Sequence, residues 1–272
     1  MNDIKTSDTS DNGEPSQQIL STPELVELHT CKAIAGWSWF YRAYTLFSEG
    51  AFKWIGICFI WLVIIVSINM VPLGSFLSSM MGPLFTGGFI FAAQRADLEG
   101  EFEVGDLFEG FRSHIGNLFV IGSLYAVGSF LVFFIGLLSM IPFVEFDTLM
   151  GLVMTDEDFT VSILIDLFYK LAMPITLTLL VISLLMMPLI MALWFAPILA
   201  MLHGVPGIQA LKMSFHGCVR NLGAFTVYAL VAIPLVIVST LPLGLGWLIL
   251  GPVLVLTTYT AYKDIFVWPS ND

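Results

Sequence analysis

Two short segments of the chain place a histidine two residues before a cysteine. They are His29-Thr30-Cys31 and His216-Gly217-Cys218. Imidazole nitrogen and thiolate sulfur are common ligands of zinc and copper. Neither segment has the CxxC or HExxH spacing that usually accompanies such a site. We therefore interpret these residues as side chains that pack or face solvent, and we expect no metal or other cofactor.

Two further groups could do chemistry. Ser214 lies two residues before His216 and could form a nucleophile and base, but the sequence supplies no orienting acid or oxyanion-hole motif beside them. The acidic residues Glu145, Asp147 and 156–158 could collect a divalent cation, but they lack the alternating ligands and glycine of a calcium loop. A solvated acidic loop is the favoured interpretation. We expect the chain not to be an enzyme.

The elements that carry these residues are dominated by apolar sequence. Of the 272 residues 57% are hydrophobic and 11% are charged, whereas soluble domains average about 45–50% apolar and about 25% charged residues. Long runs at 52–77, 115–143, 171–202 and 222–262 hold one charge between them, Lys53. Runs of this length predict membrane-spanning helices. The lack of ionisable groups inside the runs argues against proton-driven transport, a charged channel ring and intramembrane acid-base catalysis.

Proline and glycine divide the apolar runs. Pro-Leu-Gly occurs at 72–74 and again at 242–244, and Pro142 ends the run between them. Because Pro stops a helix and Gly can take a positive φ, these points predict turns. The divisions predict six transmembrane helices, at about 54–71, 75–95, 116–141, 172–202, 222–241 and 244–262. The second helix of each pair contains a proline, and we expect structural bends at Pro83, Pro188 and Pro252.

The chain also resembles itself. The segment 106–118 aligns with 210–222, which sets Asn117 over Asn221, and 43–56 is a weaker third copy. Such self-similarity predicts repeats, here at about 37–98, 104–203 and 205–266. The predicted fold is therefore all-α: a polytopic membrane helix bundle of six transmembrane helices in three parallel repeats. Each repeat is an interfacial helix plus a kinked helical hairpin, and Asn117 and Asn221 mark the repeat entry into the membrane.

Basic residues indicate the orientation. All of the ten Lys and Arg except Lys170 fall on one side of the predicted spans, so both termini are expected in the cytoplasm. Five cations form a belt beside the predicted interfacial helices and, besides setting topology, are candidate headgroup contacts for anionic lipids: Arg95, Arg112, Lys212, Arg220 and Lys263.

Two polar segments lie outside the predicted bundle. Residues 1–22 are acidic with little apolar content, which predicts a disordered cytoplasmic tail. An acidic periplasmic insertion is expected at about 143–168, and the six-span membrane domain covers 23–268. The net charge of -11 comes largely from these segments, so we expect no nucleic-acid partner. The N-terminus has no cleavable signal peptide pattern, and three distant cysteines predict no disulfide framework.

Four motifs carry a resemblance to a known family: GWSWF at 36–40, WFAP at 194–197, SFHGCVRN at 214–221 and YTAYKDIF at 259–266. They resemble an uncharacterised family of proteobacterial six-span inner-membrane proteins, and the similarity covers roughly residues 34–268. The resemblance implies a location in the inner membrane and the fold, but no reaction. The helix-then-hairpin unit also looks like the membrane domain attached to some glycerophosphodiester phosphodiesterases, whose catalytic domain is absent here.

These observations support two functional hypotheses. The first is a non-enzymatic membrane scaffold or accessory subunit that contacts membrane lipids and a protein partner or a second copy of itself. It rests on the charge-free spans, the small-residue bends and the tail. The alternative is a lipid or small apolar-solute transporter or permease component, in which three kinked helices enclose a cavity. An enzyme is the third and least supported hypothesis.

Overall fold

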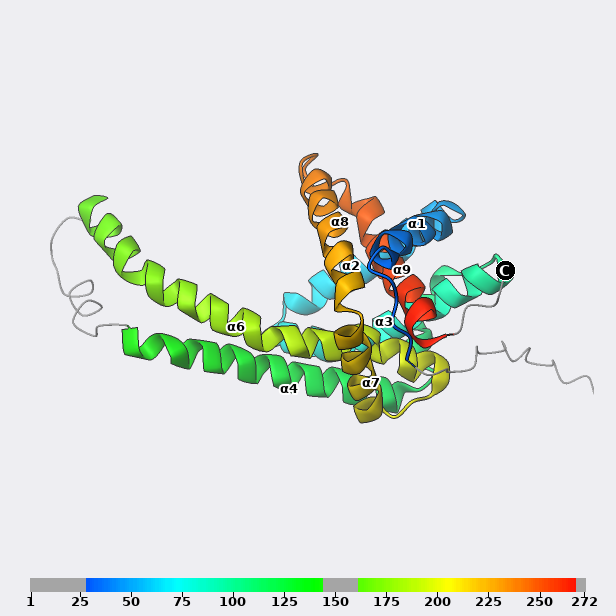
Figure 1. Ribbon diagram of the computed structural model, residues 1–272, viewed down its shortest axis with the longest axis horizontal. Helices are drawn as coiled ribbons and strands as arrows, with labels where there is room; N and C mark the ends of the chain where they lie inside the picture. The colour runs from blue at the N-terminus through cyan, green and yellow to red at the C-terminus, as the bar shows by residue number, and fades with distance from the viewer. Residues whose placement is uncertain (1–27, 144–160, 268–272) are drawn as a thin grey trace, which may run out of the picture.

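The computed structural model describes residues 28–143 and 161–267, and these residues form helices and short turns (Figure 1). The all-α class is therefore confirmed. The helices, in chain order, are α1 (Ala35–Ser48), α2 (Ala51–Asn69), α3 (Gly74–Glu99), η1 (Val104–Phe111), α4 (Ile115–Met140), η2 (Ile141–Phe143), α6 (Val161–His203), α7 (Gly207–Arg220), α8 (Leu222–Thr240) and α9 (Trp247–Phe266).

Two predictions concern segments at the edge of this description. The acidic tail at 1–22 lies outside the described residues. Of the predicted insertion at 143–168, residues 144–160 also lie outside them, whereas Val161 onward is already α6. The extent of the insertion and the side of the membrane on which it lies therefore stay predictions.

Five helices within the described residues are long and apolar enough to cross a membrane: α2, α3, α4, the Phe168–His203 part of α6, and α8. The chain is therefore an integral membrane protein. The sixth predicted span corresponds to α9, which is not among the five. Its first half is apolar, but its second half carries the polar run 257–260 and the charged pair Lys263 and Asp264. Because of these residues, α9 does not meet the criterion of length and apolarity that the other five helices meet.

The two Pro-Leu-Gly segments form turns as predicted, by different means. In the second, Leu243 and Gly244 both have positive φ, 53° and 81°. In the first, Leu73 rather than Gly74 takes the positive φ, at 66°. Gly74 is needed for another reason: a Cβ there would lie 1.9 Å from the carbonyl oxygen of Ile68, so only glycine lets the chain turn back this closely.

The helices pair as α2 with α3, α4 with α6 and α8 with α9, and α4 and α6 run side by side as the longest pair (Figure 1). The fully buried side chains gather at one end of the fold, which we call the base. There the C-terminal ends of α3, α6 and α9 meet α1, η1 and α7. The turns that join α2 to α3 and α8 to α9 lie away from the base and expose large apolar side chains, for example Leu73 at 84% and Leu243 at 99%.

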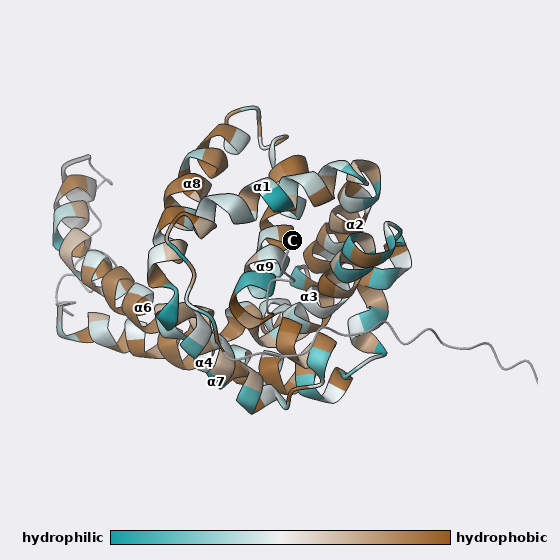
Figure 2. Ribbon diagram, turned by 45° about the vertical axis from the view of Figure 1, so that its right-hand side comes forward, coloured by the Kyte–Doolittle hydropathy of each residue, from teal (hydrophilic) through white to brown (hydrophobic). Residues whose placement is uncertain are grey.

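Much of the apolar surface of the spanning helices is not buried by other parts of this chain. Only 11% of the apolar window of α2 and 6% of that of α8 are buried within the protein, although most residues of these two helices are hydrophobic (Figure 2). Apolar surface of this extent is not stable in water. Lipid acyl chains or another membrane protein must therefore cover it.

Close backbone contact occurs at glycines other than those beside the predicted bends. A Cβ built on Gly122 of α4 would lie 2.0 Å from the carbonyl oxygen of Met80 in α3, so these two helices touch through their backbones. Gly82 and Gly251, which precede Pro83 and Pro252, have nothing within 4 Å of an added Cβ. Within the described chain, no other backbone therefore approaches the bends at these two glycines.

This contrast makes a matched pair of substitutions. Gly122→Ala should destabilise the protein by about 1–3 kcal/mol, because α3 and α4 must separate to admit the methyl group. Gly82→Ala adds the same methyl group to open space, and should be neutral or stabilising by up to about 1 kcal/mol, since Ala favours a helix over Gly. Thermal unfolding of the two variants in the same detergent tests this. Equal melting temperatures would contradict the close crossing of α3 and α4.

Candidate functional site

The C-terminal half of α9 bonds to three other helices at the base. The Tyr259 hydroxyl donates to Asp97 Oδ2 at 2.9 Å, and Lys263 Nζ lies 2.6 Å from the same oxygen, which ties α9 to α3. The Tyr262 hydroxyl is hydrogen bonded to Nε2 of His203, which ties α9 to α6. These contacts use side chains from successive turns of one helix, so α9 connects the other elements of the base.

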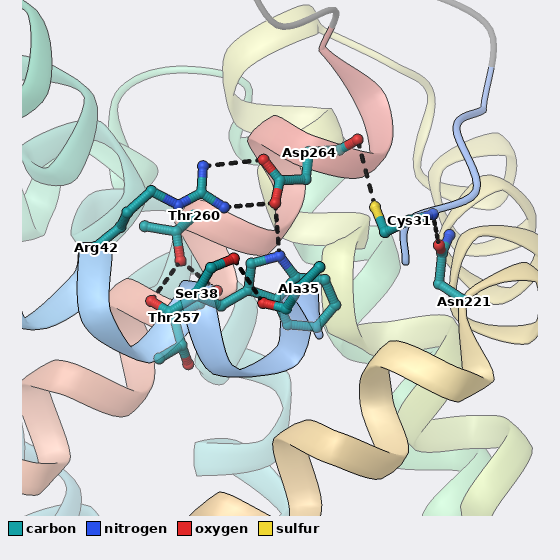
Figure 3. Close-up of polar contacts among 9 residues, drawn as sticks. Cys31, Ala35, Ser38, Arg42, Asn221, Thr257, Thr260 and Asp264 are labelled. Carbon is teal, nitrogen blue, oxygen red and sulfur yellow. Dashed lines mark hydrogen bonds and ion pairs between the residues drawn. The ribbon is translucent and has the colours of Figure 1, made fainter. Parts of the chain in front are cut away.

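Asp264 fixes α1 against α9 (Figure 3). The two terminal nitrogens of the Arg42 guanidinium donate to the two carboxylate oxygens, at 2.9 and 2.5 Å, and Trp39 Nε1 donates to Oδ2 at 2.8 Å. The Thr260 hydroxyl adds a bond to the Trp39 carbonyl at 3.0 Å. A bidentate pair of this kind sets the distance and the angle between its two elements.

Asn221 clamps the N-terminal segment, residues 28–34, which we call the strap (Figure 3). Its Oδ1 accepts from the Cys31 N–H at 2.7 Å, and its Nδ2 donates to the carbonyls of His29 at 2.9 Å and Gly217 at 3.0 Å. Asn221 is 2% exposed and joins α7 to α8. On its other side, the strap donates from the His29 N–H to the Ile265 carbonyl at 3.0 Å. The strap thus fastens the α7–α8 junction to the end of α9.

Ser214 of α7 is built into the backbone of α6. Its hydroxyl accepts from the Phe195 N–H at 2.9 Å and donates to the Met191 carbonyl at 2.7 Å. An unbroken α-helix would join these two backbone groups directly. Because Pro197 follows two residues later, this is a point where α6 opens. Ser214 is 0% exposed, so the hydroxyl considered above as a nucleophile has a structural role here.

The two cysteines of the His-x-Cys segments lie in surroundings that disfavour thiolate. Burial and, to a smaller extent, the nearby Asp264 carboxylate together raise the pKa of Cys31 to about 11. Burial also raises the pKa of Cys218 to about 12. Thiolate is the form that attacks substrates and binds metals. The strap brings the backbones of the two segments together through Asn221, yet the described residues contain no group of three His, Cys, Asp or Glu arranged to hold a metal ion.

The predicted bend prolines all lie inside helices. Pro83 is in α3, Pro188 in α6 and Pro252 in α9; Pro83 and Pro252 are buried, whereas Pro188 is exposed. The structure adds three prolines inside helices that the sequence analysis did not single out. These are Pro174 and Pro197 in α6 and Pro234 in α8.

The two predicted entry asparagines differ in what they hold. Asn221 makes the three bonds described above, whereas Asn117, in the first turn of α4, makes one long bond of 3.4 Å to the carbonyl of Gly204. Asn117 is also only partly buried. The sequence alignment therefore pairs two residues of the same type and position that have different structural importance.

The five predicted headgroup cations also divide. Arg95 is held by Asp106 at 2.9 Å and by Glu99 at 3.1 Å, and Lys263 is held by Asp97. Arg112 is 77% exposed and 4.0 Å from Glu109. Lys212 and Arg220 are exposed on α7. Two of the five thus serve contacts inside the base, and three face outward.

Sequence reasoning missed the acids and aromatics of the base, above all Asp97 and Asp264. A signal was present in the motif at 259–266, which sets two charges and three hydroxyls on a helix whose first half is apolar. Polar groups on such a helix must find partners. The partners of Asp264, such as Arg42, lie more than two hundred residues away in the sequence. No local sequence pattern identifies them.

Asn221→Ala should destabilise the protein far more than Asn117→Ala. The first leaves the half-buried Cys31 N–H and His29 carbonyl without the amide, at up to about 1–3 kcal/mol for each group. The second removes one long bond and should cost less than about 1 kcal/mol. Thermal unfolding in detergent compares the two. A similar loss in both variants would show that Asn221 does not clamp the strap.

Alkylation of Cys31 gives a second readout of the same clamp, in a chain whose Cys58 and Cys218 are replaced by Ala. An unperturbed thiol has a pKa of about 8.5. Because the pKa of Cys31 is raised to about 11, the fraction of thiolate near neutral pH is smaller, and the alkylation rate should keep rising well above pH 9. Adding Asn221→Ala should shift the midpoint down. A midpoint near 8.5 without that change would contradict the half-buried position of Cys31 in the strap.

The comparisons with known proteins agree with a membrane location. The chain is 30% identical over 215 residues to a protein of Burkholderia thailandensis named as a probable inner membrane protein, and the match covers 76% of this chain and 74% of that relative. No family model matches the chain, and no solved structure matches it. Identity at this level over three quarters of both chains indicates common descent, and the chain therefore belongs to the same family of bacterial inner membrane proteins as this relative.

Proposed function

We propose that the protein is a non-enzymatic scaffold or accessory subunit of the bacterial inner membrane. The observation that carries this proposal is the base itself. There the polar side-chain atoms of Asp264, Asn221 and Ser214 form hydrogen bonds that hold one element of the fold against another. These bonds fix the angles between the three helix pairs. Their outer surfaces are apolar and uncovered by this chain, which suits a protein that organises lipids or a membrane partner.

We further propose that the three pairs are repeats and that α9 is a sixth span. Two observations support this. A short helix precedes each pair, namely α1, η1 and α7. In addition, Pro83, Pro188 and Pro252 lie 16, 15 and 14 residues before the last residues of α3, α6 and α9. The second short helix departs from the expected pattern, because η1 is a 3₁₀ helix of eight residues.

The position of the C-terminus tests the sixth span. With six crossings both termini lie in the cytoplasm, and the segment 144–160 lies in the periplasm. With only the five helices that meet the apolar criterion, the C-terminus lies on the opposite side from the N-terminus. Alkaline phosphatase, which is active in the periplasm, and green fluorescent protein, which is fluorescent in the cytoplasm, can each be fused after residue 272 and within 144–160. Phosphatase activity at the C-terminal fusion would overturn the six-span proposal.

The scaffold role is tested by extraction of the full chain from native membranes in mild detergent, with mass spectrometry of the proteins and lipids that come with it. We expect a protein partner or a second copy in fixed stoichiometry. The association should be weakened in Asn221→Ala and kept in Asn117→Ala, because only the first loosens the base. A single monodisperse chain without any stoichiometric protein would count against this function.

One observation favours the second candidate, a lipid or small apolar-solute transporter or permease component. Gly82 and Gly251 lie beside Pro83 and Pro252 and face open space, which leaves room at the bends for an acyl chain or solute. Proteoliposomes loaded with fluorescent phospholipid test it, and Gly82→Leu with Gly251→Leu should slow any movement. Enrichment of one lipid without a protein partner in the extraction would favour this candidate.

A further inference from the structure

Most cations at the base have an acceptor inside the fold. Arg42 is bound to Asp264 and Arg95 to Asp106, and Lys53 donates to the Phe102 carbonyl at 3.1 Å. Lys32, Lys212 and Arg220 are different: they are exposed, and no carboxylate of the described residues lies within 4.0 Å of them. We call these three residues the basic edge.

The fold gathers the basic edge at one place. Lys212 and Arg220 lie eight residues apart on α7 with exposed His216 midway between them, so all three share one face of the helix. Lys32 reaches the end of this face through the strap, because Asn221 holds Cys31, and Ala33 lies 3.8 Å from a Cβ built on Gly223. Residues distant in sequence thus bring positive charge to the start of α8.

Few acids in the neighbouring elements could neutralise this charge. The strap and helices α4, α7 and α8 contain no Asp or Glu. Helix α6 has one, Asp166, near the end that lies away from the base. Helix α9 contributes Asp264, whose two oxygens are taken by Arg42 and Trp39. Within the described part of the chain the basic edge therefore keeps its charge.

The surroundings of the edge favour a bilayer surface over a soluble ligand. Three large apolar side chains beside the cations are exposed: Ile208 at 57%, Val219 at 44% and Leu222 at 45%. Arg220 is separated from the membrane-spanning helix α8 by Asn221 alone. Cations next to exposed apolar residues on a helix that leads into a span are suited to the boundary between headgroups and acyl chains.

We propose that the basic edge binds the phosphate headgroups of anionic phospholipids in the leaflet that faces the base. The five cations predicted from sequence then differ in role. Lys212 and Arg220, joined by Lys32, contact headgroups, whereas Arg95 and Lys263 bind acids of the fold. Arg112 lies beside Glu109 and is not part of the basic edge. Each cation close to an anionic leaflet strengthens the association about fivefold. The binding site is common to the scaffold and the transporter and depends on neither.

Native mass spectrometry of the full chain in detergent measures this directly. The purified protein is titrated with phosphatidylglycerol, which is anionic, and with phosphatidylcholine, which carries the same phosphate but no net charge. We expect the wild type to prefer phosphatidylglycerol, and the double variant Lys212→Gln, Arg220→Gln to lose about tenfold or more of that affinity. Arg112→Gln is the matched control, because Arg112 is also exposed but lies beside Glu109. It should retain the preference.

Each outcome bears on the proposal. The proposal is supported if only the double variant loses affinity for phosphatidylglycerol and its thermal stability is unchanged. An equal loss in Arg112→Gln would mean that phosphatidylglycerol binds any exposed cation, and would overturn it. A wild type without preference for phosphatidylglycerol over phosphatidylcholine would also overturn the proposal. If deletion of residues 1–27 then produced that preference, the proposal would still be overturned, because the acidic residues 1–27 rather than lipid would occupy the basic edge.

Discussion

The contact between Asp264 and Arg42 is the interaction on which the arrangement at the base depends. Helices in a bilayer gain little from burying apolar side chains against one another, since the lipid is as apolar as they are. The relative orientation of the helices must therefore be set by close packing and by polar bonds. In this protein the end of α9 supplies bonds to α1, α3, α6 and the strap within its last few turns. Close packing acts elsewhere, as at Gly122 against Met80.

The positions of the helices could be read from the sequence, because apolar runs and Pro-Gly turns are local patterns. The span predicted at 116–141 is the helix Ile115–Met140, and that at 222–241 is Leu222–Thr240. The prediction was weaker where a helix mixes two environments. Helix α9 is apolar in one half and polar in the other, and α6 continues beyond the predicted span to Val161.

The candidate site could be predicted only in part, because its contacts join residues far apart in the chain. Asn221 was singled out by its place in the repeat, but its partner Cys31 is 190 residues away. Asn117, singled out on the same ground, holds only Gly204. The charge pattern likewise identified Arg95, Lys212 and Arg220 as equivalent. The difference between them is whether an acid folds against them, as Asp106 does against Arg95, and the number and position of the basic residues alone do not give that information.

The bonds that α1 and the strap make to α9 affect the order in which the protein is assembled during synthesis. Arg42 leaves the ribosome 222 residues before Asp264, which at a synthesis rate of about 5–20 residues per second is a delay of roughly 10–45 seconds. During that interval α1 and the strap have no α9 to bind, while α2, α3 and α4 are already available for insertion. The last helix therefore completes the base, and a chain interrupted before α9 presents an unpaired guanidinium at the membrane surface. Such a chain lacks the bonds that α9 makes at the base, and incompletely folded chains are acted on by chaperones and proteases.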